Sequence, residues 1–142
     1  MQTQKPSLIM VVPTLRCDHD CMYCQVSRAP LTSKKHDLTL TPEVIADAID
    51  QIAAPNFKLE FQGGEPLLNF EMVKYIVLEA KKRNLSLNRN LQFVIATTMS
   101  LITDEILDFC KEHKIIISSS FVINSAVTLP VSISLIIVPK GT

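Results

Sequence analysis

The sequence predicts an α/β protein built on a parallel sheet. Short apolar runs alternate with stretches of helical periodicity along most of the 142 residues, and this alternation is typical of successive βα units. Two motif-like segments, 17–24 and 63–66, each follow directly after an apolar run. Because active sites of parallel barrels lie at the carboxyl ends of the strands, we expect both segments at the same edge of the sheet.

The first unit joins an apolar strand over residues 8–12 to a helix that begins near residue 42. Thr41 is placed as the N-cap, Pro42 suits the first helical position, and Glu43 is an acid in the first turn. The following apolar residues recur with helical spacing and predict one buried face. That face consists of Val44, Ile45, Ala48, Ile49 and Ile52.

A second strand is marked by Leu59 and Phe61, and a second helix follows it with Asn84 placed as a C-cap. The run 91–96 predicts a third strand, whose continuous apolar character suits a sheet buried on both faces. The buried stripe of the second helix is predicted to contain Met72, Val73, Ile76, Val77 and Ala80.

The third helix is predicted to open at Thr103, and a fourth strand to start at 115–117 and end in the serines 118–120. Cys110 falls on the apolar stripe of that helix and is most simply a buried core residue. The stripe comprises Ile102, Ile106, Leu107 and Cys110.

Three cysteines, Cys17, Cys21 and Cys24, stand at C-x3-C-x2-C spacing immediately after the first predicted strand. Three thiolates on one loop can each hold one iron of a [4Fe–4S] cluster, which normally takes four cysteine ligands. The fourth iron then keeps an open position for a substrate or cofactor. The alternatives are a small zinc site, with His19 as the fourth ligand, and a thiol–redox pair.

The run Gly63, Gly64, Glu65 and Pro66 follows the second predicted strand. Glycines let a backbone approach a ligand closely and adopt positive φ. An ammonium group offers only donors, so carbonyls and the Glu65 carboxylate would suit its binding site. The chain has only three glycines and two of them are here, which favours a binding loop over an ordinary turn.

Together, the cysteine triplet and the Gly-Gly-Glu-Pro run resemble the radical S-adenosylmethionine (radical SAM) superfamily over residues 8–120. The resemblance implies the N-terminal portion of a partial (β/α)6 barrel, with about four strands and three helices. It also implies one-electron reductive cleavage of SAM at the cluster, which gives a 5′-deoxyadenosyl radical for peptide or protein modification. The segments 12–19, 23–28, 60–69 and 93–97 look like the maturase branch, and in particular like the maturase of His-Xaa-Ser peptide systems.

The same resemblance suggests further cofactor contacts, for which packing or capping roles are the alternative. The Gly63–Pro66 run would receive the SAM amino group, and Tyr23 would lie beside the cluster and the adenine. Hydroxyl groups at the ends of the third and fourth strands could exchange hydrogen bonds with the ribose, Ser120 being the best candidate. These hydroxyl residues are Thr97, Thr98, Ser118 and Ser120.

Charge and targeting signals limit the partners. Lys and Arg balance Asp and Glu at 14 each, with no basic stripe, so no nucleic acid is expected. Clustered cysteines without a disulfide framework or a secretory signal predict a cytoplasmic protein, and no membrane span is expected. The resemblance implies a peptide or protein substrate and a reductant such as ferredoxin or flavodoxin.

The composition changes after residue 120. Residues 121–142 hold no Asp or Glu and a single charge, Lys140. We therefore predict a radical SAM core over 1–120 and a divergent, poorly packed tail over 121–142, typical of a truncated or frameshifted reading frame. An inactive remnant of such an enzyme is accordingly the alternative function.

Overall fold

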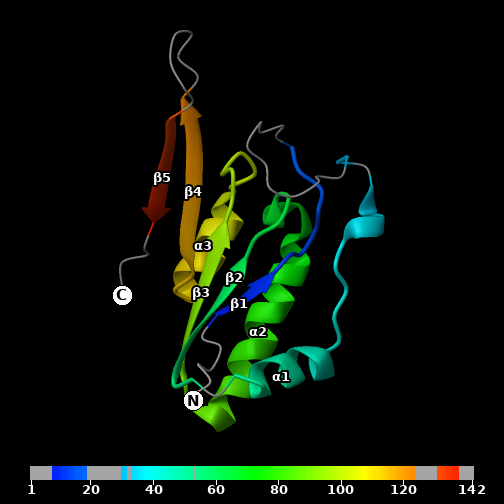
Figure 1. Cartoon of the computed structure of the whole chain (residues 1–142), viewed down its shortest axis with the longest axis vertical. Helices are drawn as coiled ribbons and strands as arrows, with labels where there is room; N and C mark the ends of the chain where they lie inside the picture. Colours follow the sequence, from blue (N-terminus) through cyan, green and yellow to red (C-terminus); the bar gives the residue numbers. More distant parts are fainter. Residues whose placement is uncertain (1–7, 19–29, 32, 53, 124–130, 138–142) are drawn as a thin grey trace, which may run out of the picture.

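Strand order in the sheet follows chain order. A computed structural model of the chain describes residues 8–18, 30–31, 33–52, 54–123 and 131–137, and within them five strands form one sheet in the order β1-β2-β3-β4-β5 (Figure 1). The first four strands are parallel, and β5 is antiparallel to β4. The strands are β1 (Leu8–Val11), β2 (Asn56–Phe61), β3 (Asn90–Ala96), β4 (Ile116–Ile123) and β5 (Val131–Ile137).

Three α-helices connect the parallel strands: α1 (Pro42–Asp50), α2 (Phe70–Leu87) and α3 (Asp104–Glu112). Because βαβ crossovers are right-handed and each step moves to the next strand in the same direction, the helices lie over one face of the sheet. The predicted class, an α/β protein with about four parallel strands and three helices, is confirmed. The fifth strand was not predicted.

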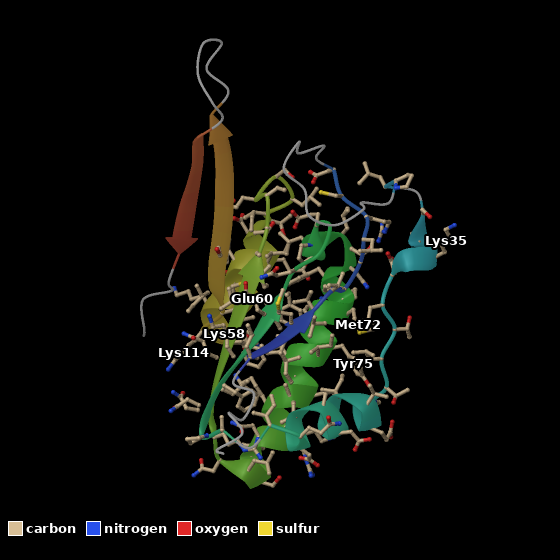
Figure 2. The ribbon with its side chains drawn as sticks, in the orientation of Figure 1. Lys35, Lys58, Glu60, Met72, Tyr75 and Lys114 are labelled. Atoms are coloured by element: carbon tan, nitrogen blue, oxygen red, sulfur yellow. The ribbon has the colours of Figure 1, made fainter. Side chains whose placement is uncertain are left out.

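Alternating strand residues separate a covered face from an open one. Val11, Phe61, Ile95 and Ile117 stand in one register row. Phe61 and Ile95 in that row are 0% and 1% exposed and belong to the core beneath the helices. The next row carries Met10, which is 57% exposed, and Glu60. Figure 2 labels Glu60 and Lys58, which come from this open face of β2.

Side-chain caps start two of the helices where the sequence predicts them. Thr41 Oγ1 accepts a hydrogen bond from Val44 N (3.5 Å), and Thr103 Oγ1 accepts one from Ile106 N (3.3 Å). Each bond satisfies one of the amide groups that a first helical turn leaves unpaired. Val44, however, is 49% exposed, so its prediction as a buried residue is wrong.

The predicted end of α2 is also wrong. The helix continues to Leu87 and ends at Asn88, which adopts the left-handed conformation (φ 49°). Asparagine tolerates this conformation better than most residues. The Asn84 side chain instead binds the backbone of Arg89, in the turn after the helix. Its Oδ1 accepts from Arg89 N (3.1 Å), and its Nδ2 donates to Arg89 O (2.8 Å).

Two residues predicted to be buried on α3 can be compared with the structure. Cys110 is 1% exposed, as predicted for a core residue, and burial raises the pKa of its thiol to about 11. Leu107, predicted on the same buried stripe, is 40% exposed. It therefore lies toward the solvent side of the helix.

Residues beyond 120 extend the sheet. β4 does not end at the serines but runs to Ile123, because its backbone pairs with β5 from Ile117↔Ile137 to Ile123↔Val131. The side chains of residues 121–123 and of β5 lie outside what the structure describes, so poor packing of the tail stays a prediction. No helix in the described part of the chain is long and apolar enough to cross a membrane.

Candidate functional site

The segments that follow β1, β2 and β3 meet at one edge of the sheet, the upper edge in Figure 1. Val11, Phe61 and Ile95 stand in register near the ends of these strands. The residues after them therefore emerge side by side. This carboxyl-end rim receives Cys17, the run 63–66 and Thr97, as the sequence predicts for segments that follow parallel strands.

Backbone hydrogen bonds join the cysteine segment to the glycine loop. Gly64 N donates to Thr14 O (3.1 Å), and Glu65 N donates to Arg16 O (2.6 Å). The residue immediately before Cys17 is thus bonded directly to the Gly-Gly-Glu-Pro run. Cys17 itself is half-buried.

The two glycines are required by the chain's own backbone. Gly63 has a φ of +116°, which disfavours any L side chain. A Cβ on Gly64 would lie 2.1 Å from Arg16 O and 2.6 Å from Leu15 O. The sequence predicts that these glycines allow close approach of a ligand, and this stays a prediction. The described contacts show a close approach of the cysteine segment.

Glu65 is 0% exposed, and its carboxylate accepts four hydrogen bonds, three of which join the segment after β2 to the residues that follow β3. Its Oε1 accepts from Leu67 N (3.1 Å) and Thr97 Oγ1 (2.7 Å). Its Oε2 accepts from the backbone and the hydroxyl of Thr98, both at 2.8 Å. Because an ionised carboxylate has about four acceptor positions, these bonds offset the cost of burying it.

The loop after β3 reaches back to the cysteine segment. Thr98 Oγ1 lies 2.9 Å from Ser100 Oγ, and the Ser100 hydroxyl donates to Asp18. Met99 adopts a left-handed backbone (φ 67°), and its N–H donates to Thr97 Oγ1 (3.1 Å). The rim is therefore a closed arrangement in which each of the three segments contacts the other two.

An ion pair between buried Arg16 and half-buried Asp37 lies at the base of the cysteine loop. Arg16 is 7% exposed and binds Asp37 with two charge-assisted hydrogen bonds of 2.7 Å. Its guanidinium also donates to Leu31 O (3.1 Å) and Leu68 O (3.0 Å). Thr14 Oγ1 donates to Asp37 (2.7 Å). We call Thr14, Arg16 and Asp37 the Arg16 clasp.

The clasp joins both ends of the loop that carries the cysteines, because Arg16 precedes it and Leu31 follows it. A planar guanidinium suits this task since it can donate several hydrogen bonds in a fixed geometry. Hydrogen bonds from Arg16, followed by those from Thr14, hold the pKa of Asp37 below its ordinary value of 3.8, and burial opposes them in part.

Asn69 supports the clasp from the start of α2. Its Nδ2 donates to Pro13 O (2.9 Å) and to Leu38 O (3.3 Å). Asn69 occupies the N-cap position of the helix, yet its side chain makes no capping bond. It is used instead to join the segments before and after the cysteine loop.

The predicted site residues fall into two groups. Cys17, Gly63, Gly64, Glu65, Pro66 and Thr97 lie on the rim in the described part of the chain, and Ser118 O accepts a hydrogen bond from Thr97 N (2.9 Å). Cys21, Tyr23 and Cys24 lie outside the described residues, as does the alternative zinc ligand His19. The backbone of Ser120 is in β4, but its side chain lies outside what the structure describes.

Sequence reasoning missed Arg16, Asp37 and Asn69. Their only sequence signal is position: Arg16 adjoins Cys17, and Asn69 closely follows the Gly63–Pro66 run. Asp37 stands 21 residues from Arg16, in a polar segment without a recognisable pattern. No local spacing could have paired them.

The parallel strands with helices on one face have the architecture of a portion of an α/β barrel. A cysteine segment, a glycine loop and hydroxyl side chains lie at the carboxyl ends of its strands. The Radical SAM superfamily model matches residues 11–122. The chain therefore belongs to the radical SAM superfamily.

Curated relatives support this membership. An uncharacterized protein of Methanocaldococcus jannaschii is 34% identical over 101 residues, which cover 70% of this chain and 32% of that protein. The radical SAM cyclopropyl synthase TigE of Paramaledivibacter caminithermalis is 28% identical over 127 residues, which cover 80% of this chain and 26% of TigE. The chain thus spans about a third or less of the length of these two relatives.

Solved structures of anSMEcpe share the fold. The structure with bound AdoMet and Cp18Cys peptide has a TM-score of 0.58 at 20% identity, covering 78% of this chain and 30% of that chain. A second, with AdoMet and Kp18Cys peptide, has a TM-score of 0.59 at 24% identity over the same shares.

Proposed function

We propose that this chain is the N-terminal portion of a radical SAM enzyme that modifies a peptide or protein. In this proposal Cys17, Cys21 and Cys24 hold a [4Fe–4S] cluster, and SAM binds against the loop Gly63–Pro66. The observation that carries the proposal is the hydrogen bond from Glu65 N to Arg16 O (2.6 Å). It joins the segment that leads to the first cysteine directly to the loop proposed for SAM.

The residues present fit a cluster. Cys17 is half-buried at the rim, and thiolates are the usual ligands of iron–sulfur clusters. The Arg16 clasp holds the backbone segment that leads to Cys17 without help from the cluster. When bound, the cluster would supply the single electron that cleaves SAM reductively to a 5′-deoxyadenosyl radical.

The chain's own groups would bind and orient SAM. Carbonyl oxygens of the loop 63–64 would accept hydrogen bonds from its ammonium group. The ammonium contact predicted for the Glu65 carboxylate requires the exchange of one of its four present bonds. We infer that the main role of Glu65 is to hold β2 and β3 together under the cofactor. The contacts predicted for Tyr23, Thr97, Ser118 and Ser120 remain part of the proposal.

Substrate and partners follow from relatives rather than from the site. TigE is a radical SAM cyclopropyl synthase, and anSMEcpe was solved with peptides bound. The peptide bound to anSMEcpe supports a peptide or protein substrate for the whole enzyme, and TigE supports radical SAM chemistry. A ferredoxin or flavodoxin reductant, a cytoplasmic location and the His-Xaa-Ser branch complete the proposal.

The proposed division into a core over 1–120 and a tail over 121–142 carries one structural consequence. β4 spans Ile116–Ile123, so the boundary would fall inside a strand. The tail would then supply the last residues of β4 and all of β5.

Anaerobic reconstitution of the full chain with iron and sulfide tests the cluster. We expect about four irons per chain with a broad charge-transfer absorption. Cys17→Ala, Cys21→Ala and Cys24→Ala should each abolish it. Cys110→Ala is the matched control and should retain it, because that thiol is buried in the core, at 1% exposure. Stoichiometric zinc without iron would establish the zinc alternative and overturn the proposal.

SAM binding separates an enzyme portion from an inactive remnant. Addition of SAM to the reduced, reconstituted chain should change the EPR spectrum of the cluster, since SAM would occupy the open iron. An unchanged spectrum at saturating SAM, in a sample with full iron content, would show a cluster loop without a cofactor site. That result would favour the remnant.

A further inference from the structure

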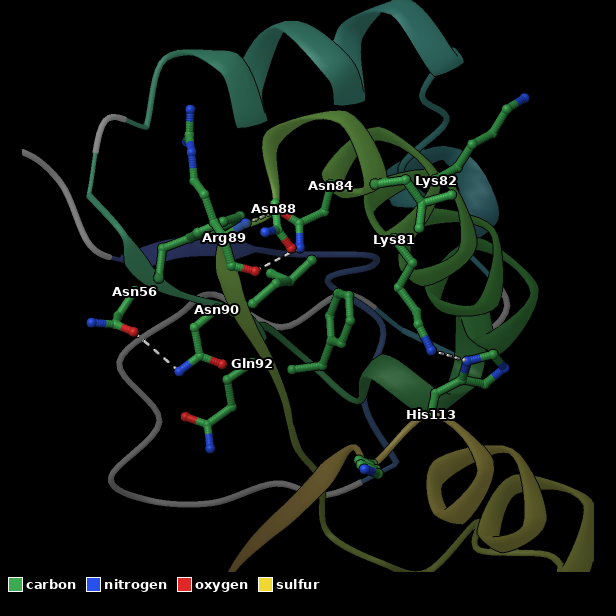
Figure 3. Close-up of a pocket in the computed structure, with 14 residues that line it drawn as sticks. Asn56, Lys81, Lys82, Asn84, Asn88, Arg89, Asn90, Gln92 and His113 are labelled. Carbon is green, nitrogen blue, oxygen red and sulfur yellow. Dashed lines mark hydrogen bonds between the residues drawn. The ribbon is translucent and has the colours of Figure 1, made fainter.

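A pocket in the described part of the chain lies at the amino ends of β2 and β3, at the opposite end of the sheet from the rim. Figure 3 shows this pocket in close-up. Its volume is about 830 Å³, and it lies among the starts of β2 and β3, the last turns of α2, and the turn after α3. We call it the amino-end pocket. Because β2 has six residues, the pocket and the rim are separated by roughly 20 Å.

The described lining of the amino-end pocket is cationic. It includes Lys81, Lys82, Arg89 and Lys114, together with His113, and none of the described lining residues is acidic. The whole chain has a formal net charge of zero, so this pocket concentrates one sign of charge. Arg89 is already engaged, since its Nη1 donates to Ile49 O (3.2 Å) and its guanidinium lies over the Phe57 ring.

Lys114 occupies a position that favours glycine. Helix α3 ends in a Schellman arrangement, in which Ile115 N donates to Cys110 O (2.8 Å) and Lys114 N donates to Lys111 O (3.3 Å). The residue between helix and strand in this motif is left-handed and usually glycine. Lys114 adopts that conformation with a φ of 54°. The chain therefore places a long cation on a strained turn at the pocket, where glycine would suit the backbone better.

Lys81 meets the pocket from the other side. Its Nζ lies 3.0 Å from His113 Nδ1, as Figure 3 shows. A neutral imidazole nitrogen can accept this bond, whereas an imidazolium cannot. Burial, followed by the charge of Lys81, lowers the pKa of His113, and Glu112 opposes them. Besides these groups, His113 faces the Phe109 ring of α3, at a centroid distance of 4.4 Å.

We propose that the amino-end pocket binds a small, multiply charged oxyanion through Lys81 and Lys114. Its volume is within the range of about 300–1,000 Å³ that is usual for small-ligand sites, and exceeds what one inorganic phosphate would fill. Phosphate esters and polycarboxylates share the required chemistry. The ligand would be bound at a site separate from the carboxyl-end rim.

Titration of the full chain with sodium pyrophosphate, followed by NMR of the His113 ring, tests the proposal. A bound anion stabilises the imidazolium, so the pKa of His113 should rise with pyrophosphate concentration and saturate. A His113→Gln variant assigns the resonance among the three histidines. A parallel titration with citrate separates the sources: a phosphate site prefers pyrophosphate, and a polycarboxylate site prefers citrate.

Lys114→Gly separates binding from structure. Glycine suits the left-handed turn, so thermal stability should not fall, while the Kd for the better anion should rise about threefold to tenfold. Lys81→Gln should weaken binding by a similar factor. Lys35→Gln, which removes an exposed charge from the turn Lys34–His36, is the matched control and should leave the Kd unchanged.

Two outcomes would overturn the proposal. One is the absence of a saturable shift at His113 with either anion in the folded chain. The other is a Kd that Lys35→Gln changes as much as Lys114→Gly does, because this would indicate general attraction to a positive surface. Neither measurement needs iron, sulfide or SAM, so the result is independent of the proposed cluster chemistry.

Discussion

The two ends of the sheet use polar side chains differently. At the carboxyl-end rim, Arg16 is paired with Asp37 and the carboxylate of Glu65 accepts four hydrogen bonds. At the amino-end pocket, Lys81 and Lys114 have no acidic partner among the described lining residues. The rim is held together by its own charges, whereas the pocket presents charge of one sign.

The backbone shows the same difference. At the rim, a side chain at Gly63 or Gly64 would collide with the segment 12–16, which follows β1. Left-handed residues other than glycine occur at both ends, Met99 at the rim and Asn88 and Lys114 at the amino end, so the difference lies in the close contacts of the two glycines. The contrast indicates that the rim is constrained by close packing of backbone on backbone, and that the amino end has space for side chains.

Removal of the Arg16 guanidinium should have the largest effect. Arg16→Gln would leave the half-buried Asp37 carboxylate without its main partner. Because each hydrogen bond to a charged group contributes about 1.5–3 kcal/mol, we expect a total loss of about 3–4 kcal/mol. The amino-end counterpart is Arg89→Gln, which should cost about 1 kcal/mol because it removes one hydrogen bond and a ring contact. Urea unfolding followed by circular dichroism measures both, and equal losses would contradict the distinction between the two ends.

We expect the second-largest loss of stability from a methyl group added at Gly64. In Gly64→Ala the Cβ would meet backbone oxygen atoms at 2.1 and 2.6 Å, and overpacking of this kind costs about 3 kcal/mol. Asn88→Gly, at a left-handed position of the amino end, should change the unfolding free energy by less than about 0.5 kcal/mol. If Gly64→Ala unfolded like the wild type, the close contact with the Arg16 carbonyl could not be correct.

Glu65→Gln tests the hydrogen bonds by which Glu65 joins the ends of β2 and β3. In either orientation the new NH2 would face one backbone N–H, of Leu67 or Thr98, and one threonine hydroxyl. The hydroxyl can rotate to accept, but the N–H loses its acceptor, at a cost of about 1–3 kcal/mol. Glu105→Gln is the control, since the Glu105 side chain is 75% exposed and forms a surface pair with Lys74, which should be worth less than about 1 kcal/mol. Amide exchange at Leu67 or Thr98 should also accelerate in Glu65→Gln alone.

The smallest expected effect is the change with pH in the stability that Asp37 contributes. The folded state lowers the pKa of Asp37, so its contribution to stability is complete above its ordinary value of 3.8 and is lost as the pH falls through the lowered folded value. The stability difference between wild type and Asp37→Asn should therefore shrink in acid. Unfolding curves at about pH 7 and about pH 3 measure it. For the exposed Asp50–Arg83 pair, Asp50→Asn should differ less from wild type at about pH 7; an equal difference would remove the special role of the clasp.

Local features of the sequence were enough to predict the order of the first four strands and the three α-helices. Apolar periodicity defined the α/β alternation, Thr41 and Thr103 marked two helix starts, and the position of Cys110 predicted its burial. Each of these depends on interactions within a few residues along the chain. For the same reason, the sequence predicted that the cysteine and glycine segments would emerge at one edge of a parallel sheet.

Only the tertiary structure decided which groups hold that edge together. Arg16 forms a hydrogen bond with Asp37, 21 residues away in the sequence, and Glu65 forms one with Thr97, 32 residues away. Gly64 is required by a carbonyl of another segment, and β4 extends past its serines because β5 pairs with it. Such contacts depend on how the strands lie beside one another in space, which no local spacing encodes.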